Sequence, residues 1–87
     1  MFEYSVQVKK TADSLAVIAE KINDILADDD DFNEMLSLYD DPFWWIYPKA
    51  KYSSLILEIH AEMAFLDKQW IKDHFDKVVN KETGYKV

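Results

Sequence analysis

The sequence contains no cysteine and a single glycine among its 87 residues. Without cysteine the chain can form neither a disulfide bond nor a thiolate metal site, and this predicts a protein of a reducing compartment, the cytoplasm. Loops that cradle phosphate groups need several glycines. A P-loop or a glycine-rich dinucleotide-binding loop is therefore excluded.

Arginine is also absent, so that all ten basic residues are lysines. Arginine supplies the bidentate contacts that read guanine edges and clamp phosphates. Together with a pI near 4.6, this argues against direct nucleic-acid binding, whose affinity depends on neutralising phosphates. No apolar run approaches the ~18 residues of a transmembrane helix, and residues 1–10 lack the charged-then-apolar order of a signal peptide. We therefore expect no contact with a membrane.

One segment, residues 28–47, holds the whole formal net charge of −7. It contains no lysine, whereas the rest of the chain carries ten acids and ten lysines. Its seven acids are Asp28, Asp29, Asp30, Asp31, Glu34, Asp40 and Asp41. Six aromatic residues are interleaved with them: Phe32, Tyr39, Phe43, Trp44, Trp45 and Tyr47. A neutral body with one acidic, aromatic-rich segment indicates a contact with a basic surface.

The N-terminal third predicts a strand and then a helix. Residues 2–9 alternate, with Phe2, Tyr4, Val6 and Val8 on one side, as in a strand with one buried face. From Thr11 the apolar residues follow helical spacing, and Thr11 or Asp13 can serve as the N-cap. The aspartate run at 28–31 should end this helix, because clustered carboxylates oppose the negative end of its dipole.

The acidic segment itself predicts a short helix and a short strand. Asp31 and Glu34 have the spacing of a capping box and would start a helix that continues to about Tyr39. The sequence Asp41-Pro42 would close it, since a residue before proline avoids the α region. Residues 43–47 are β-prone and lie between two prolines, which is typical of an edge strand.

Residues 55–65 fit two patterns. Their odd positions are all apolar, as in a strand, yet a helical stripe also fits and the composition favours helix. We favour the strand, because Asp67 then makes a suitable N-cap for a last helix that extends to about Lys81. Gly84 is the expected stop, and residues 85–87 would add a short strand or fray.

The resulting order, β-α-(α)-β-β-α-(β), predicts a single-domain α+β fold. It fits a small ferredoxin-like sandwich, with the helices on one face of an antiparallel sheet. If residues 49–66 were helical, the chain would instead be a mostly α-helical bundle with an N-terminal strand or arm.

Catalytic motifs are not visible, and we assign no catalytic residue, no metal ligand and no cofactor. On a strand, Glu58, His60 and Glu62 would share one face, where they could bind a divalent metal or act as a base. An ordinary solvated face explains the same residues, and His74 is best explained as a partly buried or surface histidine. Four consecutive aspartates without a glycine do not match a calcium loop.

The remaining candidate site is a protein-docking patch in the acidic segment. Trp44 and Trp45 are adjacent, so on a strand one can be buried while the other faces outward. A plain solubilising loop beside core aromatics is the simpler alternative. The predicted partner-binding residues are Asp28, Asp29, Asp30, Asp40, Asp41, Trp44, Trp45 and Tyr47.

These observations predict a non-enzymatic interaction protein that binds and inhibits or regulates a basic protein surface. Small, acidic proteins without cysteine serve in bacteria and phages as immunity proteins, antitoxins or phage-encoded inhibitors. One alternative is a nucleic-acid mimic that blocks a DNA- or RNA-binding protein. A second is a small metal-dependent enzyme that uses His60, Glu58 and Glu62. A homodimer formed through the open face of the sheet is compatible with each of these hypotheses.

Overall fold

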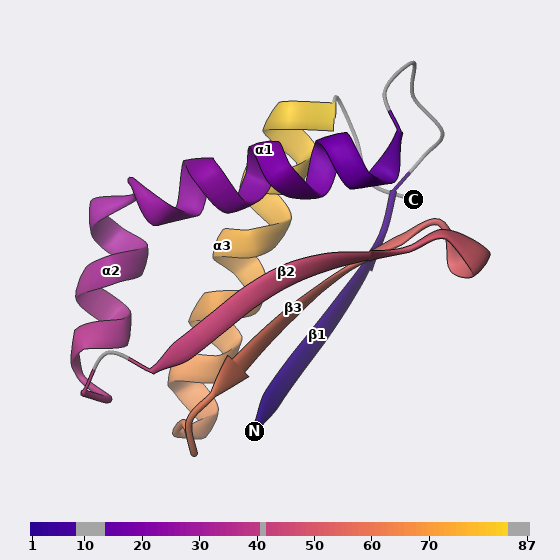
Figure 1. Cartoon of the computed structure of the whole chain (residues 1–87). Helices are drawn as coiled ribbons and strands as arrows, with labels where there is room; N and C mark the ends of the chain where they lie inside the picture. Colours follow the sequence, from indigo (N-terminus) through magenta and orange to yellow (C-terminus); the bar gives the residue numbers. More distant parts are fainter. Residues whose placement is uncertain (9–13, 41, 84–87) are drawn as a thin grey trace.

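The computed structural model describes residues 1–8, 14–40 and 42–83 (Figure 1). Three strands form one sheet, and three α-helices and one short 3-10 helix complete the described fold. In chain order these elements are β1 (Phe2–Gln7), α1 (Leu15–Ala27), α2 (Asp30–Ser37), β2 (Phe43–Lys49), η1 (Ala50–Tyr52), β3 (Ser54–His60) and α3 (Phe65–Thr83).

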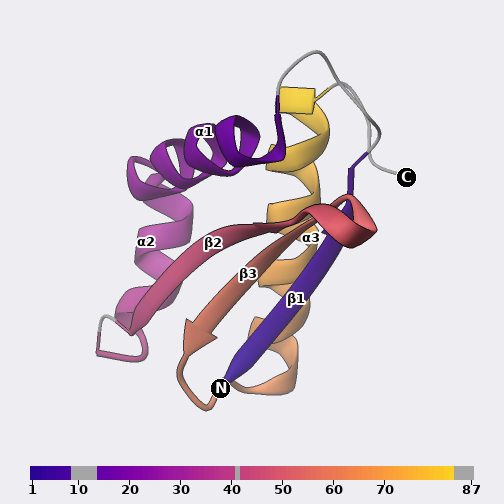
Figure 2. The same ribbon diagram turned by 45° about the vertical axis from the view of Figure 1, so that its right-hand side comes forward.

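The sheet has the strand order β1-β3-β2, and both pairings are antiparallel. Leu57 in the central strand lies between Tyr4 of β1 and Ile46 of β2. The two outer strands are therefore parallel to each other and joined by a helical crossover, as in a split β-α-β unit. Figures 1 and 2 show the helices on one side of the sheet. The predicted α+β sandwich is thus confirmed, and the alternative helical bundle is excluded.

The hydrophobic core lies between the helices and one face of the sheet. The predicted alternation in β1 is confirmed, because Phe2, Val6 and Val8 are buried and Tyr4 packs against the core. Full burial of an aliphatic or aromatic side chain contributes about 1.5–3 kcal/mol. In residues 1–8, 14–40 and 42–83, ten large side chains reach that state: Val8, Ile22, Leu26, Phe32, Leu55, Leu57, Ile59, Ile71, Phe75 and Val79.

Strand β3 confirms the strand prediction for this region but is shorter than the alternation implied. It ends at His60, and α3 begins at Phe65, two residues before the predicted start. The first turn of α3 is largely solvated, with Phe65 and Leu66 77% and 76% exposed. Phe65 was predicted to lie on the buried face of a strand, but it is an exposed residue of the helix. The predicted strand at 85–87 and the stop at Gly84 lie outside the described residues.

The ends of α1 differ in part from the prediction. Its N-cap is Ser14, whose hydroxyl accepts a hydrogen bond from the Val17 N–H at 3.3 Å. Thr11 and Asp13, the predicted caps, lie outside the described residues. At the other end α1 stops at Ala27 with Asp28 as C-cap. The prediction that the aspartate run ends this helix is confirmed.

Helix α2 starts earlier than predicted. Its N-cap is Asp29, whose Oδ1 accepts a hydrogen bond from the Phe32 N–H at 3.0 Å, so the capping box at Asp31 and Glu34 was wrong. With Asp29 as the N-cap, Phe32 lies in the core. Burial of this side chain explains why the helix is capped by Asp29 and not by Asp31. The helix ends at Ser37, and Asp41, predicted to close it, lies outside the described residues.

Candidate partner-binding site

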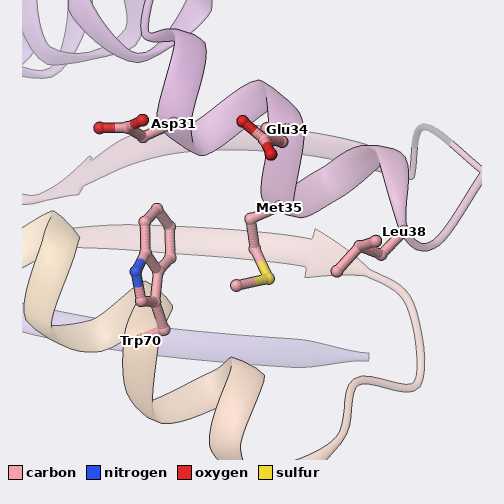
Figure 3. A pocket seen from close by; sticks show the side chains of 5 residues that line it. All are labelled: Asp31, Glu34, Met35, Leu38 and Trp70. Carbon is pink, nitrogen blue, oxygen red and sulfur yellow. The ribbon is translucent and has the colours of Figure 1, made fainter.

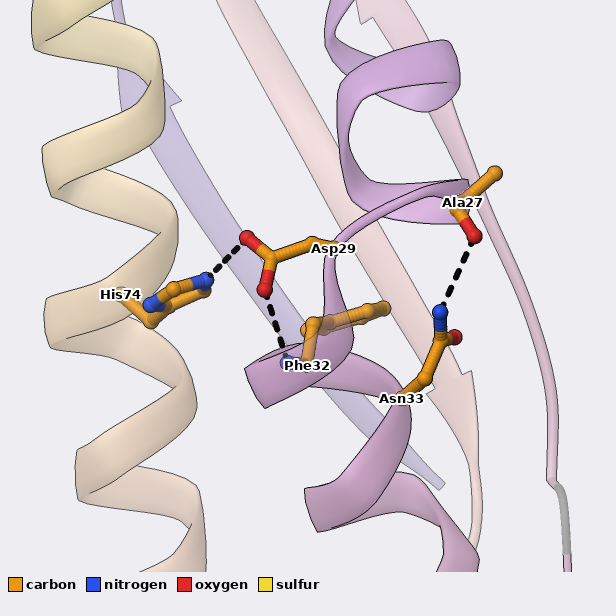
Figure 4. Close-up of polar contacts among 5 residues, drawn as sticks. All are labelled: Ala27, Asp29, Phe32, Asn33 and His74. Carbon is orange, nitrogen blue, oxygen red and sulfur yellow. Dashed lines mark hydrogen bonds and ion pairs between the residues drawn. The ribbon is translucent and has the colours of Figure 1, made fainter.

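The junction between α1 and α2 is built around Asp29. One carboxylate oxygen caps α2 through Phe32, and the other lies 2.7 Å from Nε2 of His74 on α3 (Figure 4). The Asn33 side chain closes the junction by donating a hydrogen bond to the Ala27 carbonyl at 3.0 Å. Partial burial of Asp29 opposes ionisation, but the hydrogen bonds from Phe32 and His74 outweigh it and lower the pKa of this carboxyl.

A column of aromatic rings continues from this junction. The imidazole of His74 stacks on the Trp70 indole, with ring centroids 4.6 Å apart and planes 10° apart. The His74 ring is also parallel to the ring of Phe32. Phe32 in turn contacts Trp44 edge to face, with ring centroids 5.0 Å apart. His74 therefore connects α3 with α2, and Phe32 continues the contact to Trp44 of β2, in agreement with the structural interpretation of His74.

At the far end of α2, Tyr39 holds the start of α3. Its hydroxyl accepts a hydrogen bond from the Ala64 N–H at 3.0 Å and donates one to the Asp67 carboxylate. The Ala64 N–H stands at the start of the helix and has no intrahelical carbonyl partner, so the tyrosine hydroxyl supplies an acceptor from another element. Asp67, predicted to be the N-cap, lies inside the first turn. The hydrogen bond to Asp67 raises the pKa of Tyr39.

The contact of Asp29 with His74 and the contact of Tyr39 with the start of α3 hold α2 antiparallel to α3. Between the two helices lies a pocket of about 290 Å³ (Figure 3). The pocket is open to solvent and combines two carboxylates with three apolar side chains. We call it the acidic pocket, and it is lined by Asp31, Glu34, Met35, Leu38 and Trp70. Figure 3 shows Asp31, Glu34 and Met35 extending from α2, and the Trp70 indole extending toward them from α3. Asp31 and Glu34 are three residues apart, which places them on one side of the helix.

Among the described residues, five carboxylates on and beside α2 are exposed: Asp28, Asp30, Asp31, Glu34 and Asp40. The sequence has no lysine between Lys21 and Lys49, so no neighbour along this segment neutralises them. A cluster of one sign with apolar surface beside it attracts cations and raises their local concentration. The acidic pocket lies within this cluster.

The predicted aspartates differ in role. Asp28 and Asp30 are exposed, whereas Asp29 is half-buried and has the structural contacts described above. Asp40 is exposed in the turn after α2 and adopts a left-handed conformation with φ 59°. Asp41 lies outside the described residues. Only three of these five residues are thus described as exposed carboxylates.

The aromatic residues predicted for the same patch lie elsewhere. Trp44 packs inward against Phe32, and Trp45 lies on the opposite face of the sheet with Tyr47. The expected division of the tryptophan pair is confirmed. However, Trp45 and Tyr47 are separated from the described aspartates by the sheet, so the predicted residues that the structure describes do not form one continuous patch.

Sequence reasoning missed the apolar neighbours that the aspartates do have. Trp70, Met35 and Leu38 line the acidic pocket, and Trp70 comes from a helix about 40 residues away along the chain. One signal was present, because Trp70 and His74 are four residues apart and must be neighbours on a helix. Which element they face depends on tertiary packing.

Glu58 and His60 do share the open face, with 3.1 Å between Oε1 and Nε2. Glu62 lies beyond the end of β3 and does not belong to that face, so the predicted three-residue constellation is not formed. Within the described ranges, no group of three histidine, aspartate or glutamate side chains is placed to hold a metal ion.

No protein-family model, curated protein or solved structure matches the chain. In the part of the chain that the structure describes, no helix combines the length and the apolarity that crossing a membrane requires.

Proposed function

We propose that this chain is a non-enzymatic interaction protein that binds, and thereby inhibits or regulates, a basic surface of another cytoplasmic protein. The observation that supports this is the acidic pocket, in which two carboxylates from the segment that holds the net charge lie beside the Trp70 ring of α3. The negative charge would attract the partner, and the pocket would receive one of its side chains.

The charge acts before contact. Exposed carboxylates around α2 produce a negative potential that steers a basic partner and raises its association rate. At an ionic strength of about 0.15 M the Debye length is about 8 Å, so this attraction acts over roughly the size of the cluster. Binding should weaken steeply as salt is added.

The pocket acts at contact, and it fits one long cationic side chain. The stem of a lysine or arginine can lie along Leu38 and Met35, while its charged end reaches Asp31 and Glu34. The Trp70 ring adds a cation–π attraction. A volume of about 290 Å³ is at the lower limit of small-molecule pockets, about 300–1,000 Å³. A single side chain of a protein partner therefore fits better than a whole metabolite.

Capture of the partner from a lysate of the source organism tests this proposal. The charge variant is Asp31→Asn combined with Glu34→Gln, and its matched control is Glu20→Gln with Asp24→Asn on α1, which removes the same charge from an exposed face elsewhere. The apolar variant is Leu38→Ser, with Leu66→Ser as control, because Leu38 and Leu66 are similarly exposed at 69% and 76%.

We expect both pocket variants to lose the same partner and both controls to retain it. Raising the salt concentration should release that partner from the unaltered protein. A partner that both pocket variants retain, or one whose capture is independent of salt, would contradict the proposal.

Nucleic-acid mimicry is the alternative within the same class. A mimic places carboxylates along an extended surface that follows the phosphates of a duplex. Here the exposed acids gather on α2 and its flanks, and an eight-residue helix is only about 12 Å long. This concentration favours a local contact with a protein. Competition by duplex DNA for the captured partner distinguishes the two, since a mimic and DNA would exclude each other.

A further inference from the structure

The face of the sheet opposite the helices is a second surface, independent of the acidic pocket. Figures 1 and 2 show the helices on the other side, and no described element lies over this open face. The strand register aligns its side chains in rows across the sheet. These rows include Phe43, Trp45, Tyr47 and Lys49 of β2 and Ile56 and Glu58 of β3.

One end of the open face carries an aromatic cluster. Phe43 and Trp45 meet edge to face with centroids 5.1 Å apart, and Trp45 lies 4.8 Å from the ring of His60. Phe43 remains 69% exposed although it is a large apolar side chain. Exposed aromatic residues grouped in this way are typical of the centre of protein interfaces.

The middle row consists of Ser5, Ile56 and Tyr47, and next to it lies the acidic end. Ile56 is 3% exposed and pairs with Tyr47 across the strands. Burial of the Tyr47 hydroxyl, and the nearby carboxylates of Glu3 and Glu58, raise the pKa of this tyrosine. Glu3 and Glu58 are themselves directly paired across the strands. They form the acidic end of the open face.

The opposite end of the same face is basic. Lys49 ends β2 in the row that pairs with Ser54, and Lys51 follows in η1. Trp45, in the acidic row, and Lys49, in the basic row, are four positions apart along β2. The open face therefore carries opposite charges on the two sides of the row of Ser5, Ile56 and Tyr47.

We propose that the open face binds a second copy of this chain, through a two-fold axis that lies between the two sheets and runs across the strands. Such an axis reverses the strand direction, so the acidic end of each copy lies over the basic end of the other. Lys49 of the second copy then faces Trp45 and Glu58, and the contact occurs twice. The row that contains Ile56 and Tyr47 in one copy meets the same row of the second copy at the centre.

Charge selects this arrangement over the other two-fold packing. An axis parallel to the strands would lay the row of Glu3 and Glu58 of one copy over the same row of the second copy. Like charges in direct opposition across an interface are unfavourable. The axis across the strands avoids this repulsion and lets each glutamate row meet a lysine.

Analytical ultracentrifugation of the full chain tests this inference. At an ionic strength of about 0.15 M, the weight-average mass should rise from that of the 10.3 kDa chain toward twice that value between about 10 µM and 1 mM. Lys49→Glu should weaken association at least tenfold, because each substitution affects both symmetric contacts. Lys49 is exposed at the end of a strand, so the variant should remain folded, as circular dichroism can verify.

Two further variants make the test specific. Combining Lys49→Glu with Glu58→Lys should restore association, because the exchange recreates the opposite-charge contact. Lys77→Glu, an equal charge change on an exposed lysine of α3, should leave association unchanged apart from the small effect of net charge. A chain that stays monomeric to about 1 mM, or a Lys49→Glu variant that associates like the unaltered protein, would overturn the inference. The acidic pocket on the helix side would be unaffected by either result.

Discussion

The carboxylate of Asp29 lies 2.7 Å from the imidazole of His74, although the two residues are 45 positions apart in the sequence. The same carboxylate caps α2. One side chain therefore starts a helix and also attaches it to α3. This double contact holds one end of the acidic pocket, and Tyr39 holds the other.

Replacing Asp29 with alanine should destabilise the fold. Loss of a helix N-cap costs about 0.5–2 kcal/mol, and loss of the partly buried contact to His74 adds to it. We expect a decrease of about 2 kcal/mol in the free energy of unfolding in urea. Asp30→Ala, which alters a neighbouring exposed carboxylate, should change it by less than about 0.5 kcal/mol. Equal losses in the two variants would show that Asp29 has no special structural role.

The contribution of Asp29 should depend on pH. Its pKa in the folded protein is below the ordinary value of 3.8, so the stabilisation is fully present above that value and is lost as the pH falls through the lower folded-state pKa. The difference in unfolding free energy between the unaltered protein and Asp29→Asn should therefore shrink below about pH 4. Urea unfolding at neutral and acid pH measures this. A difference that grows on acidification would contradict the assignment.

Tyr39→Phe should weaken the attachment between α2 and α3. The substitution removes the hydroxyl that accepts the Ala64 N–H and donates to Asp67, while the ring remains. Removal of the two hydrogen bonds should lower the urea concentration at the midpoint of unfolding. Tyr52→Phe is the matched control, because Tyr52 is 52% exposed, and it should have almost no effect. Amide exchange should also become faster in the first turn of α3 in the Tyr39 variant alone.

Ser53→Gly should stabilise the protein. Ser53 precedes β3 with φ 50°, a left-handed conformation that costs a residue with a side chain about 1–2 kcal/mol. Glycine adopts it freely, although its more flexible unfolded state offsets part of the gain. We expect a net increase of about 0.5–1 kcal/mol in thermal or urea unfolding. Ser5→Gly within β1 should have the opposite sign, since glycine weakens a strand interior.

Elements with a clear local period could be predicted from the sequence. The alternation of β1, the apolar stripe of α1 and the strand at residues 43–47 all recur in the structure. The boundaries were less certain, because several aspartates compete for one cap. Asp29 rather than Asp31 caps α2, since this choice buries Phe32 and reaches His74, and both consequences involve other elements.

For the candidate site, the acidic charge could be located but its apolar neighbours could not. Trp45 was the expected companion of the aspartates because it is near them in sequence. In the structure it lies across the sheet, and Trp70 takes that position instead. Sequence proximity is a poor guide here, because adjacent strand residues point to opposite sides of a sheet.

The sequence by itself determined the α+β order, the segment that carries the net charge, and the division of Trp44 and Trp45 between two faces. Each of these follows from composition or from a period within one element. Only the tertiary structure decided that Asp31 and Glu34 meet Trp70, and that the open face has an acidic and a basic end. These features arise from the packing of α3 on α2 and from the strand register, which bring together residues that no local period relates.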